Sequence, residues 1–127
     1  MAVSNRSAEG AGLPLTLDQR RAADAWRCVQ DKQRDYVNLA KGLPALIMNS
    51  GLLQVMAFLE EKDSKPSQRL ACQMRAWLHQ RFPNLPEDFK GFMQAVMATD
   101  PRPFQEITAE SLAWLRWLRQ LAAAVNR

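Results

Sequence analysis

Apolar residues recur along most of this chain at intervals of three and four, the spacing that gathers side chains on one face of an α-helix. The first such run follows Thr16, which forms a capping-box pattern with Gln19. It extends to about Lys41, with one interruption near Lys32 and Gln33. We therefore expect one long amphipathic helix over this whole run.

Two corners are predicted in the segment that follows. Gly42 is well placed to end the first helix in a left-handed conformation, and Pro44 suits the first turn of the next helix, where its missing N–H is harmless. A second corner is expected at Ser50 and Gly51. The segment thus predicts a short apolar helix between the corners and another apolar helix that closes on the charged residues 60–62.

Two further helices are predicted from their start signals. Ser64 is a suitable N-cap for a helix over about residues 66–81. Glu87 and Asp88 are expected in the first turn of the next helix, where negative charge suits the helix dipole. We expect that helix to end near Ala98.

A proline-rich break over residues 100–103 precedes the last predicted helix, which is expected to start near Thr108. No segment alternates apolar and polar residues long enough to form a β-strand. The pattern predicts an all-α fold, a single-domain bundle of five or six helices over residues 15–127, after a flexible tail over residues 1–14. The tryptophans fall within apolar helical patterns and are expected in the core: Trp26, Trp77, Trp114 and Trp117.

A chain of 127 residues is long enough to bury a core without disulfides or metals. Cys28 and Cys72 lie far apart in the sequence and lack a metal-binding spacing, so we expect packed thiols in a cytoplasmic protein. The first residues contain no apolar run typical of a signal peptide, and apolar stretches elsewhere are too short to span a bilayer. We expect no membrane partner.

Motifs for catalysis were not found. The single histidine, His79, has no cysteine or carboxylate at ligand spacing, and neither GxGxxG nor GxxxxGK[ST] occurs. Neighbouring acids such as Glu60 and Glu61 diverge by about 100° on a helix and therefore do not share a site. The chain is expected to be non-catalytic, with no cofactor and no bound metal.

Positive charge is unevenly distributed in this chain of net charge +4. Residues 64–86 and 111–127 contain no acid, and a block of one sign favours a polyanionic partner. The helix within the first block predicts contact with a nucleic-acid backbone, although a merely solvated face is the alternative. Its candidate nucleic-acid-binding residues are Lys65, Arg69, Arg75 and Arg81, and His79 shares a face with Arg75.

A second set of basic residues recurs every seven positions and would form a stripe about 30 Å long on one side of the first predicted helix. Such a stripe can follow several phosphates. An ordinary ion-paired face is the alternative, because Asp24 and Asp31 lie four residues after two of the arginines. The stripe consists of Arg20, Arg27, Arg34 and Lys41.

Four segments of the chain resemble a known family. The segment 39–47 reads LAKGLPALI, residues 49–52 read NSGL, and residues 57–59 read AFL. The closing segment 107–122 carries ITAESL followed by Trp-Leu and Leu-Ala pairs. Together they resemble the small-subunit family of the type III-B CRISPR RNA-silencing effector, the Cmr complex.

This resemblance implies a small all-α protein without catalytic activity. Several copies would stack into a filament beside the backbone subunits that carry guide RNA. The filament would also meet the large polymerase/cyclase-like subunit and line the channel that holds target RNA paired to the guide. Lys41, Asn49 and Gln54 match polar positions of the family block and become secondary candidates for RNA or subunit contact, as does His79.

Two departures from the family pattern lie at the predicted corners. Gly42 stands where the family commonly has a second basic residue, and Ser50 stands where it more often has Asn. A competing hypothesis is an all-α adaptor that binds acidic proteins and no nucleic acid. A DNA-binding regulator is disfavoured, because nothing in the chain resembles a helix-turn-helix recognition helix.

Overall fold

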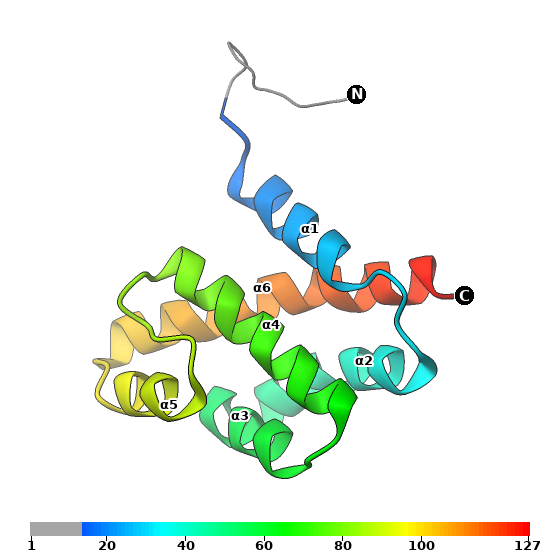
Figure 1. The fold of residues 1–127 in the computed structure, drawn as a ribbon. Coiled ribbons are helices and arrows are strands. Elements are labelled where there is room, and N and C mark those ends of the chain that lie inside the picture. Colours follow the sequence, from blue (N-terminus) through cyan, green and yellow to red (C-terminus); the bar gives the residue numbers. More distant parts are fainter. Residues whose placement is uncertain (1–13) are drawn as a thin grey trace.

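The computed structural model describes residues 14–127, and in this range the chain forms six helices and no strand (Figure 1). The predicted all-α bundle is therefore confirmed. The predicted flexible tail over residues 1–14 lies outside the described residues except for Pro14. The helices are α1 (Leu17–Cys28), α2 (Arg34–Ser50), α3 (Leu52–Glu61), α4 (Lys65–Arg81), α5 (Phe89–Met97) and α6 (Pro101–Val125).

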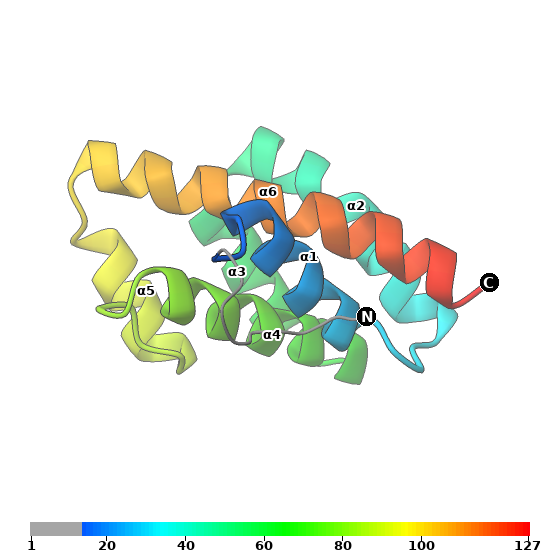
Figure 2. The same cartoon turned by 90° about the horizontal axis from the view of Figure 1, so that it is seen from above.

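The longest helix, α6, runs across the whole molecule, and α1 and α2 pack against it (Figure 1). Helix α4 contacts α2, α3 and α6, and α5 packs on α3. Seen from above, α1 lies over α6 and α4 (Figure 2). The core is formed by apolar side chains of all six helices; its largest members include Tyr36, Leu43, Met56, Met74, Trp77, Phe92 and Trp114.

The prediction of one helix from Thr16 to Lys41 is wrong, because the chain breaks between α1 and α2. Asp31 adopts a left-handed conformation with φ of 55°, which a short polar side chain tolerates. The break is held by Asn126, whose Nδ2 donates to the Val29 carbonyl at 2.8 Å and whose Oδ1 accepts from the Lys32 amide at 3.0 Å. This partner comes from the other end of the chain, so the local pattern did not reveal it.

The predicted corner at Gly42 and Pro44 is also wrong, because α2 continues through both residues. A proline inside a helix costs about 3 kcal/mol. Packing outweighs this cost, since one face of α2 is buried along its length by Tyr36, Val37, Ala40, Leu43 and Ile47. The chain turns instead at Gly51, where φ of 86° is readily adopted by glycine, so the second predicted corner is confirmed.

The predicted helix starts after Thr16 and Ser64 are confirmed. Thr16 Oγ1 accepts from the Gln19 amide at 3.1 Å, and the Gln19 side chain accepts from the Thr16 amide at 2.8 Å. Ser64 Oγ accepts from the Ser67 amide at 3.3 Å. These reciprocal caps satisfy amides that no intrahelical carbonyl can reach, so both starts are encoded locally.

The starts of the last two helices differ from prediction. Asp88 is the N-cap of α5 and accepts from the Gly91 amide at 2.8 Å, so Glu87 lies before the helix rather than in its first turn. Helix α6 begins at Pro101, seven residues before the predicted start at Thr108. The prolines fall in its first turn, where missing N–H groups cost nothing, and they begin the helix rather than break it.

Three tryptophans attach helices to one another by donating to carboxylates, of which Glu110 and Asp24 are largely buried and Asp18 is exposed. The indole N–H of Trp114 donates to Asp24 at 2.9 Å, and that of Trp117 donates to Asp18 at 2.9 Å. Both bonds join α6 to the charged helix α1. The core prediction is correct for Trp77 and Trp114, whereas Trp117 is half-buried and Trp26 is 54% exposed, so the prediction for Trp26 is wrong.

A buried carboxylate, Glu110 on α6, joins three helices and is only 3% exposed. It accepts two hydrogen bonds from Arg21 of α1, both at 2.8 Å, and one from Arg81 of α4 at 3.0 Å. Trp77 donates to it at 2.9 Å. Burial alone would raise the pKa of Glu110, but these hydrogen bonds outweigh it and hold the pKa below its usual value.

Both cysteines are free. Cys28 is buried as expected, whereas Cys72 is exposed, so the prediction that both are packed holds for one of them. Within residues 14–127, no helix is long and apolar enough to cross a membrane.

Candidate nucleic-acid interface

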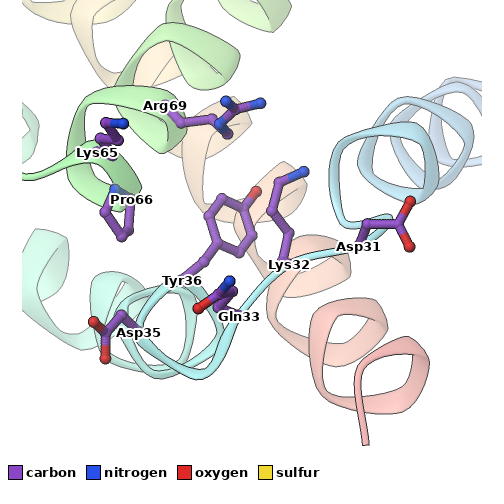
Figure 3. Close-up of a pocket in the computed structure, with 8 residues that line it drawn as sticks. All are labelled: Asp31, Lys32, Gln33, Asp35, Tyr36, Lys65, Pro66 and Arg69. Atoms are coloured by element: carbon purple, nitrogen blue, oxygen red, sulfur yellow. The ribbon is translucent and has the colours of Figure 1, made fainter.

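The first candidate site is a hollow of about 460 Å³ where the α1–α2 linker meets the first turns of α2 and α4 (Figure 3). We call it the basic hollow. Three of its side chains are cationic and two are acidic. It is lined by Asp31, Lys32, Gln33, Asp35, Tyr36, Lys65, Pro66 and Arg69.

Two of the predicted RNA-binding residues, Lys65 and Arg69, lie one turn apart at the start of α4. Both are exposed, and neither forms a salt bridge with another residue in the range 14–127. Figure 3 shows that Arg69 and Lys32 reach toward the same space beside the Tyr36 hydroxyl. The hollow therefore gathers three cations from two segments that lie about thirty residues apart in the sequence.

Lys32 is a functional candidate that the sequence analysis missed. Its Nζ donates to the Gln30 carbonyl at 2.8 Å and lies 5.6 Å from the centre of the Tyr36 ring. These contacts hold the ammonium at the mouth of the hollow. In the sequence, Lys32 was visible solely as an interruption of an apolar pattern, and its closeness to Arg69 depends on the bend between α1 and α2.

The floor of the basic hollow is rigid and uncharged. The Tyr36 hydroxyl donates to Gln73 Oε1 at 2.6 Å, and Gln73 Nε2 donates to the Cys28 carbonyl at 3.2 Å. Burial raises the pKa of Tyr36, so its hydroxyl stays protonated at neutral pH. The buried ring is not available to stack on a base.

The two acids stand at the edges of the basic hollow. In Figure 3 the carboxylate of Asp35 lies on the far side of Tyr36 and Pro66, and that of Asp31 points away from Lys32. Gln33, the N-cap of α2, makes no side-chain capping bond. Backbone amides in the first turn of α2 therefore lack a side-chain acceptor from the N-cap. The space between Lys32 and Arg69 is therefore positive and suits an anion such as a phosphate.

A second cationic hollow adjoins the first, on the side of the chain's C-terminal residues. Arg34 and Lys41 project from α2 and meet Arg127, and no acid lines this space of about 390 Å³. The two hollows are neighbours, because Asn126 lines the second and binds the amide of Lys32 in the first. The second, which we call the C-terminal hollow, is lined by Arg34, Val37, Asn38, Lys41, Ala123, Asn126 and Arg127.

The predicted continuous basic stripe is divided between two helices. Arg20 and Arg27 lie on α1, whereas Arg34 and Lys41 lie on α2. The expected ion pairs with acids four residues later do not form in the described range; Arg27 pairs instead with Asp24 at 2.6 Å. Asp31 has left the helix by that point, so it cannot face Arg27 across a helical turn.

Two of the predicted RNA-binding arginines are occupied by their own chain. Arg75 is 6% exposed, and its Nε donates to the Glu87 carbonyl at 2.7 Å. Arg81 is partly buried against Glu110. Their positions in an acid-free helix resembled those of Lys65 and Arg69. The groups that engage them come from elsewhere in the chain: carboxylates on α3 and α6, and a backbone carbonyl in the loop before α5. We give both a structural role.

The secondary candidates do not gather at the basic hollow. A ring nitrogen of His79, Nδ1, lies 2.6 Å from the Leu85 carbonyl, and Nε2 lies 4.0 Å from Glu87, so this side chain holds the loop before α5. Asn49 is exposed near the end of α2, and Gln54 is exposed on α3. No group of three or more potential metal ligands occurs within residues 14–127.

Comparison with known proteins places this chain in a family. A family model described as CRISPR-associated protein (Cas_Cmr5) matches residues 17–125. A crystal structure of a CRISPR-associated Cmr5 family protein from Thermus thermophilus has the same fold, with a TM-score of 0.71 and 24% sequence identity. The match covers 87% of this chain and 98% of that protein. A search of curated proteins found no match. Because the family model spans nearly all of the described helices, the chain belongs to the Cmr5 family, the small subunit of the type III-B CRISPR effector called the Cmr complex.

Proposed function

We propose that this small subunit holds the backbone of guide-paired target RNA in the basic hollow. The observation that carries the proposal is the meeting of Lys32, Lys65 and Arg69 around one space, with the two lining acids turned to its edges. Lysine and arginine neutralise phosphates and thereby release counterions, which is the main source of sequence-independent affinity for nucleic acid.

The chemistry of the hollow suits backbone contact and offers little to read a base. Its cations come from flexible side chains, and the one aromatic ring is buried beneath them. Contacts of this kind position an RNA without selecting its sequence. Sequence selection in a guided complex falls to base pairing, as it does in guided DNA effectors.

The C-terminal hollow extends the proposed contact surface. Arg34, Lys41 and Arg127 face a space without acids, next to the basic hollow. A chain of phosphates that leaves Lys32 can therefore continue toward Arg34 and Arg127. Arg20 and Arg27, on a separate helix, are weaker candidates, because Arg27 already pairs with Asp24.

Membership of the family supports a proposal for the wider assembly. The proposed partners are guide and target RNA, the repeated backbone subunits, the large polymerase/cyclase-like subunit and further copies of this chain stacked into a filament. We propose that the subunit acts in the cytoplasm and has no catalytic activity, so that it contributes binding surface and order to the complex. The competing adaptor hypothesis assigns the same cations to acidic proteins.

The test is charge reversal within the assembled complex, with RNA capture measured at several salt concentrations. Lys65→Glu with Arg69→Glu should weaken capture and reduce the log–log salt slope by about 1.8, at roughly 0.9 per lost phosphate contact on a duplex. The matched control reverses Lys90 and Arg102, which are also exposed but lie on α5 and at the start of α6. This control changes the net charge by the same amount, and it should leave the salt slope of RNA capture nearly unaltered.

Three results would contradict the proposal. Unchanged capture by the Lys65 and Arg69 variant in an intact complex would remove the basic hollow from the RNA surface. Equal losses in the variant and the control would show a general effect of net charge. If removal of this subunit releases other protein subunits while RNA capture by the remaining complex is unchanged, the adaptor hypothesis would be favoured.

A further inference from the structure

Trp26 differs from the other three tryptophans in the hydrogen bonding of its indole N–H. Trp77, Trp114 and Trp117 each donate their indole N–H to a carboxylate at 2.9 Å. Trp26, on α1, is 54% exposed, and its indole N–H has no acceptor among residues 14–127. A large, rigid, exposed indole with a free donor is a typical anchor for a protein interface.

A groove suited to such an anchor lies between the end of α2 and α3. It has a volume of about 440 Å³, and its walls include Leu46 and Phe58, which are 38% and 40% exposed. The carboxylate of Glu61 stands at its edge and forms no salt bridge within the described part of the chain. The full lining is Leu46, Ser50, Gln54, Val55, Ala57, Phe58 and Glu61.

The groove and the exposed indole complement each other chemically. Leu46 and Phe58 offer apolar surface to the ring, and Glu61 or Gln54 offers an acceptor to the indole N–H. Lys62 Nζ lies 5.6 Å from the Phe58 ring centre, within cation–π distance of this wall of the groove. Beside Trp26, the side chain of Arg27 is 69% exposed and pairs with Asp24 through one guanidinium nitrogen, which leaves its other N–H groups for the acidic edge of the groove.

Trp26 belongs to α1 and the groove mainly to α3, and these two helices lie on opposite sides of the molecule. Figure 1 shows α1 at the top and α3 at the bottom, with α4 and α6 running between them. A single copy therefore cannot insert its own Trp26 into its own groove. Contact between unlike surfaces of successive copies is heterologous, and it repeats as long as copies are added.

We infer that Trp26 of one copy inserts into the α2–α3 groove of the next copy, so that the chain stacks head to tail. This inference rests on the self-association in the proposed function and names the two surfaces that make it. Neither surface includes a residue of the basic hollow. Each copy in the stack thus keeps its cationic side chains available to RNA.

The first experiment is disulfide trapping between two differently tagged versions of the chain. One carries Ala23→Cys, one turn before Trp26 on α1, and the other carries Ser50→Cys in the groove lining, both with the exposed Cys72 changed to Ser. Trp26 and Phe58 stay in place, so oxidation of the mixture should give a reducible mixed dimer. The control replaces Ser50→Cys with Met97→Cys, at an exposed site on α5 outside the groove, and should give little. No mixed dimer, or equal yields in both mixtures, would overturn the inference.

A second measurement removes the anchor without adding a thiol. Trp26→Ala should weaken self-association, measured by sedimentation velocity over a range of concentrations, by at least about tenfold. Met48→Ala removes an exposed apolar side chain outside the groove lining and should leave the association constant unchanged. An unchanged constant for Trp26→Ala, with helicity retained in circular dichroism, would contradict the assignment.

The stacking contact and RNA capture can fail separately. The Lys65 and Arg69 charge-reversal variant should still form the mixed dimer, because its changes lie outside both contact surfaces. If trapping succeeds while charge reversal leaves RNA capture intact, the head-to-tail contact stands and the basic hollow is not the RNA site. If trapping fails while charge reversal abolishes capture, the RNA site stands and copies meet through other surfaces.

Discussion

Replacement of Glu110 by glutamine tests whether the buried carboxylate holds three helices together. Glu110→Gln keeps the size of the side chain but removes its charge. The new NH₂ group is a donor, and it would face guanidinium and indole groups that are themselves donors. Arg21, Arg81 and Trp77 would then compete for one remaining acceptor oxygen.

The size of the effect follows from how far the partners are buried. Removing one member of a fully buried ion pair costs about 3–5 kcal/mol. The side chains of Arg21 and Arg81 are 19% and 27% exposed, so water can solvate part of each. We therefore expect the free energy of unfolding to fall by about 3 kcal/mol, the lower end of that range. At roughly 4 °C per kcal/mol for a chain of this size, Tm should fall by about 12 °C.

The assay is equilibrium urea unfolding followed by circular dichroism at pH 7, with thermal unfolding in parallel. Glu106→Gln is the control, because Glu106 lies one turn earlier on α6 and is exposed. A surface change of this kind should alter the free energy of unfolding by at most about 0.5 kcal/mol. A loss that small for Glu110→Gln would refute the reasoning and show that solvent, rather than Glu110, balances the two arginines.

The same pair of proteins gives a pH signature. The pKa of Glu110 is lower in the folded chain than its ordinary value of about 4.3. Its charge therefore stabilises the fold fully above that pH, and the contribution is lost as pH falls through the folded pKa. The difference in unfolding free energy between the native chain and Glu110→Gln should shrink below about pH 4. A difference independent of pH would contradict an electrostatic origin.

Three further predictions concern local features of the fold. Gly91→Ala should destabilise by about 1–2 kcal/mol in urea unfolding, because a Cβ there would lie 2.7 Å from Asp88 Oδ1 and disturb the cap of α5; a neutral result would show that the cap shifts freely. Asn126→Ala should cost about 1–3 kcal/mol and speed amide exchange in the α1–α2 linker, whose carbonyl and amide it binds; exchange at the unaltered rate would count against that role. Cys72 should react with a thiol reagent at pH 8 far faster than Cys28, because burial raises the pKa of Cys28 to about 11; similar rates would argue against this packing.

Much of the helical framework was predictable, because its signals are local. The capping residues Thr16 and Ser64 bond to amides within three positions, and Gly51 supplies the one left-handed glycine turn in the described range. The motifs over residues 39–59 also indicated the family correctly. Such signals depend on neighbouring residues and on backbone geometry, so they can be read without knowledge of the fold.

Tertiary contacts decided the features that the pattern placed wrongly. The break after Cys28 is held by Asn126, which lies almost a hundred residues away, and Pro44 is tolerated inside α2 because the surrounding face is buried. Trp26 repeats with the periodicity of its neighbours, yet it lies on the side of α1 that α6 does not cover.

The candidate site was likewise predicted in part from local sequence, and the rest depended on the fold. The acid-free helix indicated Lys65 and Arg69, and the structure leaves both exposed. It also buries Arg75, pairs Arg81 with Glu110, and brings Lys32 to the same hollow as Arg69. Sequence alone determined which residues are charged and which segments are helical. Only the packing of helices decided which charges meet their own chain and which remain free for a partner, because that choice depends on residues distant in sequence.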